Sequence, residues 1–252
     1  AQVQTQDRSV VPGRGSAAPL GEDERKLNLA ATELLPTDGL VRETALEIVK
    51  GKRDDITKAR AIYDWVVENT FRNPKTLGCG VGDITTMIRT GNLNGKCADL
   101  NALFVGLARA AGLPARDVYG VRVAPSQFGF KALGAGSSDI TKAQHCRAEV
   151  WLPGSGWTPA DPADVRKVVL EEPPRNLAMT DPKVVAARQA LFGSWEGNWV
   201  AFNTAHDVRL PGSGQPAIPF LMYPQAENRN GFLDSLDPEK FKYRITAREL
   251  TA

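Results

Sequence analysis

The sequence contains only two histidines and three cysteines, and no two cysteines have the Cys-x-x-Cys spacing common in zinc and thiol-exchange sites. Because structural zinc takes four Cys or His ligands, we expect no metal site, and no motif indicates a cofactor. A run of eighteen apolar residues is also absent, so no membrane span is predicted. The 31 basic and 29 acidic residues are scattered along the chain, which argues against a nucleic-acid partner.

The first twenty residues are polar, contain Gly, Pro and Ser, and show no apolar period. They predict a flexible N-terminal lead-in over residues 1–20. The chain begins with Ala-Gln, as it would after a signal peptidase cut behind a small residue. We therefore expect a bacterial periplasmic or secreted protein, although an arbitrary boundary would look the same. An odd number of cysteines in such a protein leaves a thiol unpaired and open to reaction.

Three amphipathic helices are predicted in the first third of the chain, where apolar residues recur at i, i+3, i+4 and i+7. The first spans residues 22–35 and places Leu27 on its apolar face. The second begins after Asp38, and the third runs from about Asp55 to Asn69. Both aspartates are suitable N-cap residues. These helices are expected to support a site formed elsewhere in the chain.

Alternating apolar and polar residues predict strands further along the chain. One strand lies within residues 115–124, a second begins at His145, and a Pro-Gly-Ser-Gly turn returns the chain as a hairpin. A short helix and several strand-like pieces follow Asp181. Without a repeat or a second core, the pattern favours one α+β domain over residues 21–252. Its core is expected over about 56–170, and its extension over about 171–252.

A cysteine opens the helix predicted within NGKCADLNALFVGLARAAGLPAR, residues 94–116. Gly112 and Pro114 are expected to end this helix. In the first turn, Cys97 would lie among unpaired backbone N–H groups at the positive end of the helix dipole, which favours the thiolate. The same amides can donate to an oxyanion. Cys97 is therefore a candidate nucleophile, the alternative being a small buried apolar residue.

A nucleophilic cysteine needs a base, and the base needs a partner that orients it. His145 is suitable because it begins a strand after a flexible Gly/Ser-rich loop, where its side chain can face a cleft. Asp161 follows the hairpin turn, and the separation of 16 residues (161 − 145) suits two paired strands. We predict that its carboxylate lies beside the imidazole. The alternatives are a structural histidine and a turn residue before Pro162.

Three segments, GKCADLNALFVGLARAAGLPAR, DVYGVRV and QHCRAEVWLPGSGWTPADP, resemble the transglutaminase-like superfamily of papain-related cysteine enzymes. That family has a cysteine opening a helix, a histidine starting a strand, and an aspartate after a Gly-Trp-x-x-x-Asp hairpin. All three motifs occur here in that order. The resemblance covers roughly residues 56–165, and the segment GNWVAFNTAHDVRL is similar to the extension of bacterial exported members.

The resemblance implies a papain-like core of helices packed on an antiparallel sheet, with a strand-rich C-terminal extension. It also implies that Cys97 is the nucleophile, His145 the general base and later acid, and Asp161 the orienting carboxylate. We expect a cysteine-dependent peptidase or amidase that cleaves a peptide or carboxamide bond through a thioester. We expect the protein to be a monomer. Its expected substrate is a peptide or a protein, and a cell-wall peptide is one candidate. The alternatives are a protein-glutamine acyl transferase (transglutaminase) and a non-catalytic peptide- or cell-wall-binding module.

One position departs from the family pattern, because Cys146 and Arg147 follow the histidine where Ala-Trp is common. Strand alternation should point Cys146 to the opposite face from His145. A disulfide between Cys79 and Cys146 is predicted, with two buried free thiols as the alternative. These two cysteines could also form an exchanging redox pair, although the usual Cys-x-x-Cys spacing is missing.

Three further residues are candidates for substrate contacts. Gln144, next to the base, is a candidate oxyanion donor or substrate contact, with a solvated loop role as the alternative. Trp151 and Trp157 are candidate cleft walls, the alternative being packing within the hairpin. Substrate specificity is expected in residues 71–95, residues 127–144 and the C-terminal strands.

Each member of the catalytic set also has a rival in the sequence. Cys79 in its glycine-rich loop could replace the nucleophile, and Asp164 could replace the orienting carboxylate. His206 with Asp207 could form another base pair, although an edge-strand pair is the simpler interpretation. Asp99, in the first turn after the cysteine, is interpreted as helix-start electrostatics.

Overall fold

A four-stranded antiparallel sheet lies at the centre of this computed structural model, which describes residues 1–250. Its strand order is β6-β5-β4-β8. The strands are β4 (Ala115–Arg122), β5 (Gln144–Leu152), β6 (Gly156–Ala160) and β8 (Trp199–Asn203). The register places His145 opposite Gly120 in β4 and Trp151 opposite Trp157 in β6. The predicted β5–β6 hairpin is therefore confirmed, as is the predicted α+β class with helices on an antiparallel sheet.

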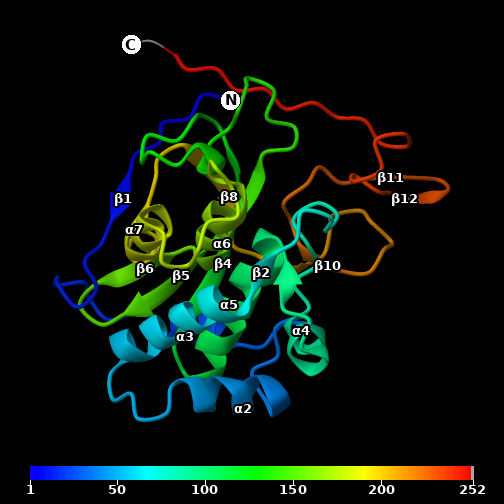
Figure 1. Cartoon of the computed structure of the whole chain (residues 1–252). Helices are drawn as coiled ribbons and strands as arrows, with labels where there is room; N and C mark the ends of the chain where they lie inside the picture. The colour runs from blue at the N-terminus through cyan, green and yellow to red at the C-terminus, as the bar shows by residue number, and fades with distance from the viewer. Residues whose placement is uncertain (251–252) are drawn as a thin grey trace.

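Seven α-helices and one short 3-10 helix surround the sheet in the described residues (Figure 1). They are α1 (Glu22–Leu29), α2 (Gly39–Ile48), α3 (Asp55–Asn69), α4 (Ile84–Thr90), α5 (Cys97–Ala110), η1 (Lys131–Leu133), α6 (Pro162–Glu171) and α7 (Pro182–Ala190). Every residue of α5 is buried, because α2 and α3 contact it on one side and the sheet on the other. None of the helices within residues 1–250 is both long and apolar enough to cross a membrane.

The main core joins the helices to the sheet around α5. Ile62 and Tyr63 of α3 and Phe104 of α5 are fully buried. The ring of Tyr63 meets the ring of Phe104 edge-on, with centroids 6.5 Å apart. Burying each such side chain contributes about 1.5–3 kcal/mol to the free energy of unfolding. This packing holds α5 in one position on the sheet and thereby sets the place of its first residue.

Helix α1 is shorter than predicted, ending at Leu29 because Ala30 has extended backbone angles of φ −67° and ψ 145°. Leu27 is 70% exposed, whereas Asn28 is buried and donates to the carbonyl of Glu24 at 2.8 Å. The apolar period through residue 35 was misleading, because Leu35 reaches the core from the loop between α1 and α2 and not from a helix.

The N-terminal segment, predicted to be flexible, is partly attached to the rest of the fold. Strand β1 (Arg8–Ser9) pairs antiparallel with β7 (Ser194–Trp195), and the Arg8 guanidinium bonds the buried carboxylate of Glu149. Backbone pairing and a long-range ion pair do not require apolar residues at regular spacing. The hydrophobic pattern of the sequence therefore could not predict these two contacts. The boundary of a single domain over residues 21–252 stays a prediction.

Helix α6 is absent from the sequence-based prediction, which ended the hairpin at Pro162. Pro162 instead occupies the first turn of α6, where its missing N–H costs no hydrogen bond. Asp161 is the N-cap, and its side chain accepts the N–H of Asp164 at 3.0 Å. The strand β6 therefore passes directly into a helix, with Asp161 at the junction.

The C-terminal extension consists of short paired strands. These are β9 (His206–Val208) with β10 (Ile218–Phe220), and β11 (Ala226–Asn228) with β12 (Gly231–Leu233). Residues 241–246, one of the strand-like pieces expected after Asp181, form only one bridge, between Thr246 and Asp139. Strands β2 (Phe71–Arg72) and β3 (Asn94–Gly95) pair in parallel just before α5. Figure 1 shows β11 and β12 projecting on the side of the molecule opposite β1.

The buried and exposed faces of the first helices can be tested by truncation. Ile62→Ala should lower the free energy of unfolding by about 2–5 kcal/mol, because it leaves a cavity in the core. Leu27→Ala, a change of the same kind at an exposed site, should alter it by less than about 0.5 kcal/mol. Urea unfolding followed by circular dichroism measures both values. A large loss in Leu27→Ala would contradict the observed exposure of Leu27.

Candidate active site

The start of α5 is held by a carboxylate one turn into the helix. Asp99 accepts the N–H of Lys96 at 3.0 Å and the N–H groups of Val81 and Gly82 at 2.9 Å each. This agrees with the helix-start interpretation and adds a second role, since Asp99 ties the preceding glycine-rich loop to the helix. Cys97 lies between these anchors as the first helical residue, with only 4% of its surface exposed.

Most of the amides at this helix terminus are already bonded. Ala98 donates its N–H to the carbonyl of Cys79 at 2.9 Å, and Asp99 donates to the carbonyl of Lys96 at 3.2 Å. Within residues 1–250, no backbone or side-chain acceptor bonds the N–H of Cys97. The sequence predicted several unpaired backbone N–H groups at this helix start. Within the described part of the chain, the structure leaves one of them free, the N–H of Cys97 itself.

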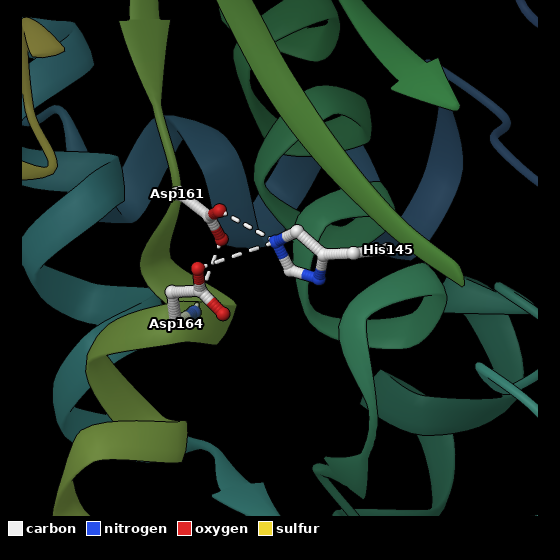
Figure 2. Close-up of side chains that lie close together, drawn as sticks. All are labelled: His145, Asp161 and Asp164. Atoms are coloured by element: carbon white, nitrogen blue, oxygen red, sulfur yellow. Dashed lines mark hydrogen bonds and ion pairs between the residues drawn. The ribbon is translucent and has the colours of Figure 1, made fainter. Parts of the chain in front are cut away.

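His145 lies at the start of β5 with its ring beside two carboxylates. Its Nε2 is 2.7 Å from Oδ2 of Asp161 and 3.4 Å from Oδ2 of Asp164. Figure 2 shows both carboxylates on the same side of the ring. The structure thus brings the predicted pair of His145 and Asp161 together. Because Nε2 faces the carboxylates, Nδ1 is the ring nitrogen left to serve the cysteine.

The two carboxylates are held in different ways. Oδ1 of Asp161 accepts the N–H of Asp164 at 3.0 Å and Nδ2 of Asn101 at 3.2 Å. Both oxygens of Asp164 are bonded to Nη2 of Arg122, at 2.6 and 2.7 Å. Asp164 is therefore farther from His145 and engaged by a guanidinium, whereas Oδ2 of Asp161 lies closest to the ring. Arg122 itself was not predicted from the sequence.

Asn101 connects the three elements that carry the candidate residues. It lies four residues after Cys97, on the same face of α5, and is fully buried. Its Nδ2 donates to the carbonyl of Cys146 in β5 at 2.8 Å as well as to Asp161, and its Oδ1 accepts the N–H of Ala163 at 3.3 Å. Sequence reasoning missed Asn101, although a lone amide on an apolar helix, at i+4 from the cysteine, was a usable signal.

Strand β8 supports the histidine from the other side. The indole Nε1 of Trp199 donates to the carbonyl of His145 at 2.9 Å. Gly120 makes room for this contact, since a Cβ there would lie 2.5 Å from the Trp199 ring and 2.1 Å from the carbonyl oxygen of Val200. The backbone of His145 is therefore fixed by a residue more than fifty positions later.

The surroundings of Cys97 favour its thiolate. Hydrogen bonds from the side chains of Cys146 and Cys79 lower the pKa of Cys97 well below its usual value. The charge of His145 and a hydrogen bond from it act in the same direction, while burial opposes them. These interactions favour the thiolate form of Cys97 over its thiol form.

The surroundings of His145 favour its protonated form. Burial and the nearby Arg122 oppose protonation, but Asp164, Asp161 and the charge on Cys97 outweigh them and raise the pKa of His145 to about 10. Both shifts favour a pair made of a thiolate and an imidazolium. Such a pair combines a ready nucleophile with a proton donor.

The three cysteines form one buried cluster, and all of them are free thiols. The predicted disulfide between Cys79 and Cys146 is not formed in this structure, where both thiols are directed at the sulfur of Cys97. Sγ of Cys79 also lies 3.4 Å from the carbonyl oxygen of Gln144, which is a second acceptor for its single proton. Hydrogen bonding to Cys97 and burial raise the pKa of Cys79, and burial raises the pKa of Cys146. Both stay protonated donors, which makes Cys79 a poor rival nucleophile.

The structure separates the three candidates for substrate contacts. Gln144 lines the same cleft as Cys97 and His145. Trp151 and Trp157 do not, because they pack on each other across the hairpin, edge-on with centroids 5.6 Å apart. Nε1 of Trp157 donates to Glu24 of α1 at 2.9 Å. The tryptophans therefore belong to the hairpin packing, which was the alternative interpretation.

The rival base pair does not form. Nε2 of His206 is 3.3 Å from Oδ2 of the buried Asp117, and its ring lies edge-on to Tyr119. Asp207 instead accepts the N–H of Glu33 at 3.0 Å. Neither His206 nor Asp207 lines the cleft of Cys97.

A cleft of about 850 Å³ opens onto Cys97 and His145. Its walls come from residues 75–79, residues 134–144 and residues 235–243 of the C-terminal extension. Tyr223 also lines it, and the hydroxyl of Tyr223 accepts the N–H of Cys79 at 2.7 Å. The walls include parts of all three regions expected to carry specificity.

A metal ion would have to compete with bonds that already exist. In residues 1–250, the set of donors close enough for a cation is His145, Asp161 and Asp164, whose atoms lie within 4.8 Å of one another. Nε2 of His145 is bonded to Asp161, and both oxygens of Asp164 are bonded to Arg122. These donor atoms already have hydrogen-bond partners within the protein. The arrangement is therefore better suited to holding a proton than a metal ion.

The connecting role of Asn101 predicts a large effect of its removal. Asn101→Ala should lower the free energy of unfolding by about 2–3 kcal/mol, because the carbonyl of Cys146 and the N–H of Ala163 would be left buried without partners. Asn94→Ala, at an exposed position nearby, should change it by less than about 0.5 kcal/mol. Chemical unfolding measures both. Equal values would mean that the Asn101 bonds do not hold the three elements together.

Comparison with known proteins places this geometry in context. Residues 42–162 match the model of the transglutaminase-like superfamily. An uncharacterized protein of Haemophilus influenzae is 41% identical over 231 residues, which cover 88% of this chain and 62% of that protein. The chain therefore spans less than two thirds of the length of this relative.

Two solved structures are similar over part of the chain. The periplasmic domain of TgpA from Pseudomonas aeruginosa is 21% identical, covering 60% of this chain and 49% of that one, with a TM-score of 0.45. Red sea bream transglutaminase is 19% identical, covering 56% of this chain and 26% of that one, with a TM-score of 0.32.

Proposed function

Because residues 42–162 belong to the transglutaminase-like superfamily, we propose that the protein is a cysteine-dependent peptidase or amidase with Cys97 as its nucleophile. One observation carries the proposal. A sulfur with a lowered pKa opens a helix and lines a cleft, together with an imidazole whose Nε2 is 2.7 Å from Asp161. A purely structural cysteine needs neither the charge nor the cleft.

In the first half of the reaction, the thiolate of Cys97 attacks a peptide or carboxamide carbonyl carbon. The carbonyl oxygen becomes an oxyanion, to which the free N–H of Cys97 can donate. His145 then gives its Nδ1 proton to the departing nitrogen, the C–N bond breaks, and an amine leaves. A thioester on Cys97 and a neutral imidazole remain.

In the second half, His145 removes a proton from water as the water oxygen attacks the thioester. The C–S bond breaks, the carboxylic acid leaves, and the thiolate and imidazolium return. Asp161 keeps the ring in the orientation that exposes Nδ1 and stabilises its charge. Asn101, bonded to Asp161 and to the backbone of β5, holds both partners in place.

An amine in place of water would give acyl transfer, the alternative function. The cleft favours water, because the lysines that line it without an ion-pair partner in residues 1–250 repel a protonated amine. Hydrolysis is therefore the better-supported outcome.

The state of Cys97 can be measured by alkylation. Near pH 6, iodoacetamide should label Cys97 at least about tenfold faster than an ordinary thiol, because its lowered pKa favours the reactive thiolate. The rate should fall as pH drops through the lowered pKa of Cys97, which protonates the sulfur. His145→Ala should also lower the rate, since it removes the stabilising charge. Peptide mass mapping identifies the labelled cysteine, and Cys97→Ala is the control.

Cys79 and Cys146 should stay unlabelled under these conditions, because their pKa values are raised. Equal labelling rates in the wild type and in His145→Ala would remove the catalytic interpretation of the pair.

The two carboxylates should have separable effects on peptide hydrolysis. Asp161→Asn should lower kcat by about 10³–10⁴-fold across the pH range, because the ring loses its orienting partner. Asp164→Asn should mainly lower the pKa of His145, since Asp164 is one of the groups that raise it. As the pH rises, the activity of Asp164→Asn should therefore begin to decline at a lower pH than that of the wild type, because its imidazolium loses the proton earlier. Steady-state rates over a pH series distinguish the two, and reversed effects would assign the orienting role to Asp164.

The reaction type is tested with a peptide mixture, incubated with and without a simple primary amine and analysed by mass. Hydrolysed products should dominate in both samples and disappear in Cys97→Ala. A majority of amine adducts would favour the acyl-transferase alternative. Absence of both products and of any acid-trapped thioester would favour a binding module.

A further inference from the structure

The cleft at Cys97 is far more positive than the chain as a whole. Five lysines and two arginines line it, together with one carboxylate, Asp139. The difference of six positive charges (7 − 1) exceeds the net charge of the entire chain, which is +2. The excess is therefore a local property of this surface.

Part of this charge is neutralised within the protein. Arg122 is bonded to Asp164, and Arg72 is bonded to Glu171. Lys167 lies 3.9 Å from the same Glu171. These three cations belong to the fold of the wall and have internal partners.

Four lysines of the wall have no such partner. Among the ion pairs of residues 1–250, none involves Lys75, Lys96, Lys142 or Lys242, and the lining Asp139 is taken by Arg244 at 3.0 Å. Lys75, Lys142 and Lys242 are exposed, and Lys96 is half-buried beside the nucleophile. Four cations thus face the cleft without a carboxylate to pair with.

The four lysines come from separate parts of the chain. Lys75 precedes the Cys79 loop, Lys96 is the N-cap of α5, Lys142 lies three residues before His145, and Lys242 belongs to the C-terminal extension. If the lysines formed the charged face of a single helix, all four would lie on that one element. Here the tertiary structure gathers them around one opening, which concentrates a positive potential there.

We propose that the substrate of this site is an acidic peptide, with carboxylates on both sides of the attacked carbonyl. The proposal rests on the hydrolase function proposed above and adds its substrate class. Carboxylates would pair with the free lysines at the rim, while Phe241 and Tyr243 offer apolar surface to the peptide. The same field disfavours lysine-rich peptides and ammonium acceptors.

Binding can be measured without turnover by using the Cys97→Ala variant. Three fluorescein-labelled peptides of equal length, with Glu, Gln or Lys at alternate positions, are compared by fluorescence anisotropy. The Glu peptide should bind most tightly, the Lys peptide least, and the Kd of the Glu peptide should rise with added salt. In the same background, Lys142→Gln with Lys242→Gln should weaken its binding about fivefold.

Lys52→Gln is the matched control, since Lys52 is exposed and lies outside the cleft, between α2 and α3. It should leave the Kd unchanged. Equal binding of the Glu and Gln peptides would overturn the proposal, as would an equal loss in Lys52→Gln.

The two proposals fail in different ways. If the wild type cleaves the Gln peptide as well as the Glu peptide, the hydrolase function stands and the acidic substrate class is wrong. If the Glu peptide binds through Lys142 and Lys242 but is never cleaved, recognition of acidic peptides stands and the hydrolase function is wrong.

Discussion

The site depends on one carboxylate that performs two tasks. Oδ1 of Asp161 caps α6 by accepting the N–H of Asp164, and Oδ2 accepts from Nε2 of His145. Because a helix cap has a defined geometry, the oxygen directed at the imidazole cannot turn away without breaking the start of α6. The orientation of the base is thereby built into the folding of the helix. Asn101 extends this constraint to α5, and so to the helix that begins at Cys97.

Such an arrangement requires several charges to be buried together. Isolated charges in a protein interior are costly, but paired and hydrogen-bonded ones are tolerated. Asp161, Asp164 and the sulfur of Cys97 lie close to three groups that carry or favour positive charge, which are Arg122, Arg147 and His145. The pKa of Asp164 is lowered by Arg122 and then His145 against the effect of burial. Burial and the neighbouring Asp164 raise the pKa of Asp161.

The departure from the usual Ala-Trp after the histidine has a structural consequence. Cys146 brings a thiol donor to the sulfur of Cys97, and Arg147 lies over the Trp199 ring with its guanidinium carbon 4.7 Å from the centroid. Trp199 in turn holds the carbonyl of His145. Cys146 and Arg147, which replace the usual Ala-Trp after the histidine, therefore take part in holding Cys97 and His145. Arg147 does so through Trp199 of β8, a strand that lies outside the matched segment 42–162.

The sequence by itself determined the helices and strands whose formation depends on residues close together in the chain. Helical periodicity with Gly112 predicted α5, and strand alternation with a tight turn predicted the β5–β6 hairpin that brings Asp161 to His145. Helix α6 was missed, because Pro162 was interpreted as an end and is in fact a helix start. The end of α1 was missed because the apolar period continued beyond the helix.

Only the tertiary structure decided how the site is held and charged. Arg122 reaches Asp164 across 42 residues, and Trp199 reaches His145 across 54. The free lysines of the cleft meet from four segments, and a single sequence contains no signal for such pairings. Local patterns report backbone periodicity, whereas a buried charge network and a shared cleft depend on which distant surfaces the core brings into contact.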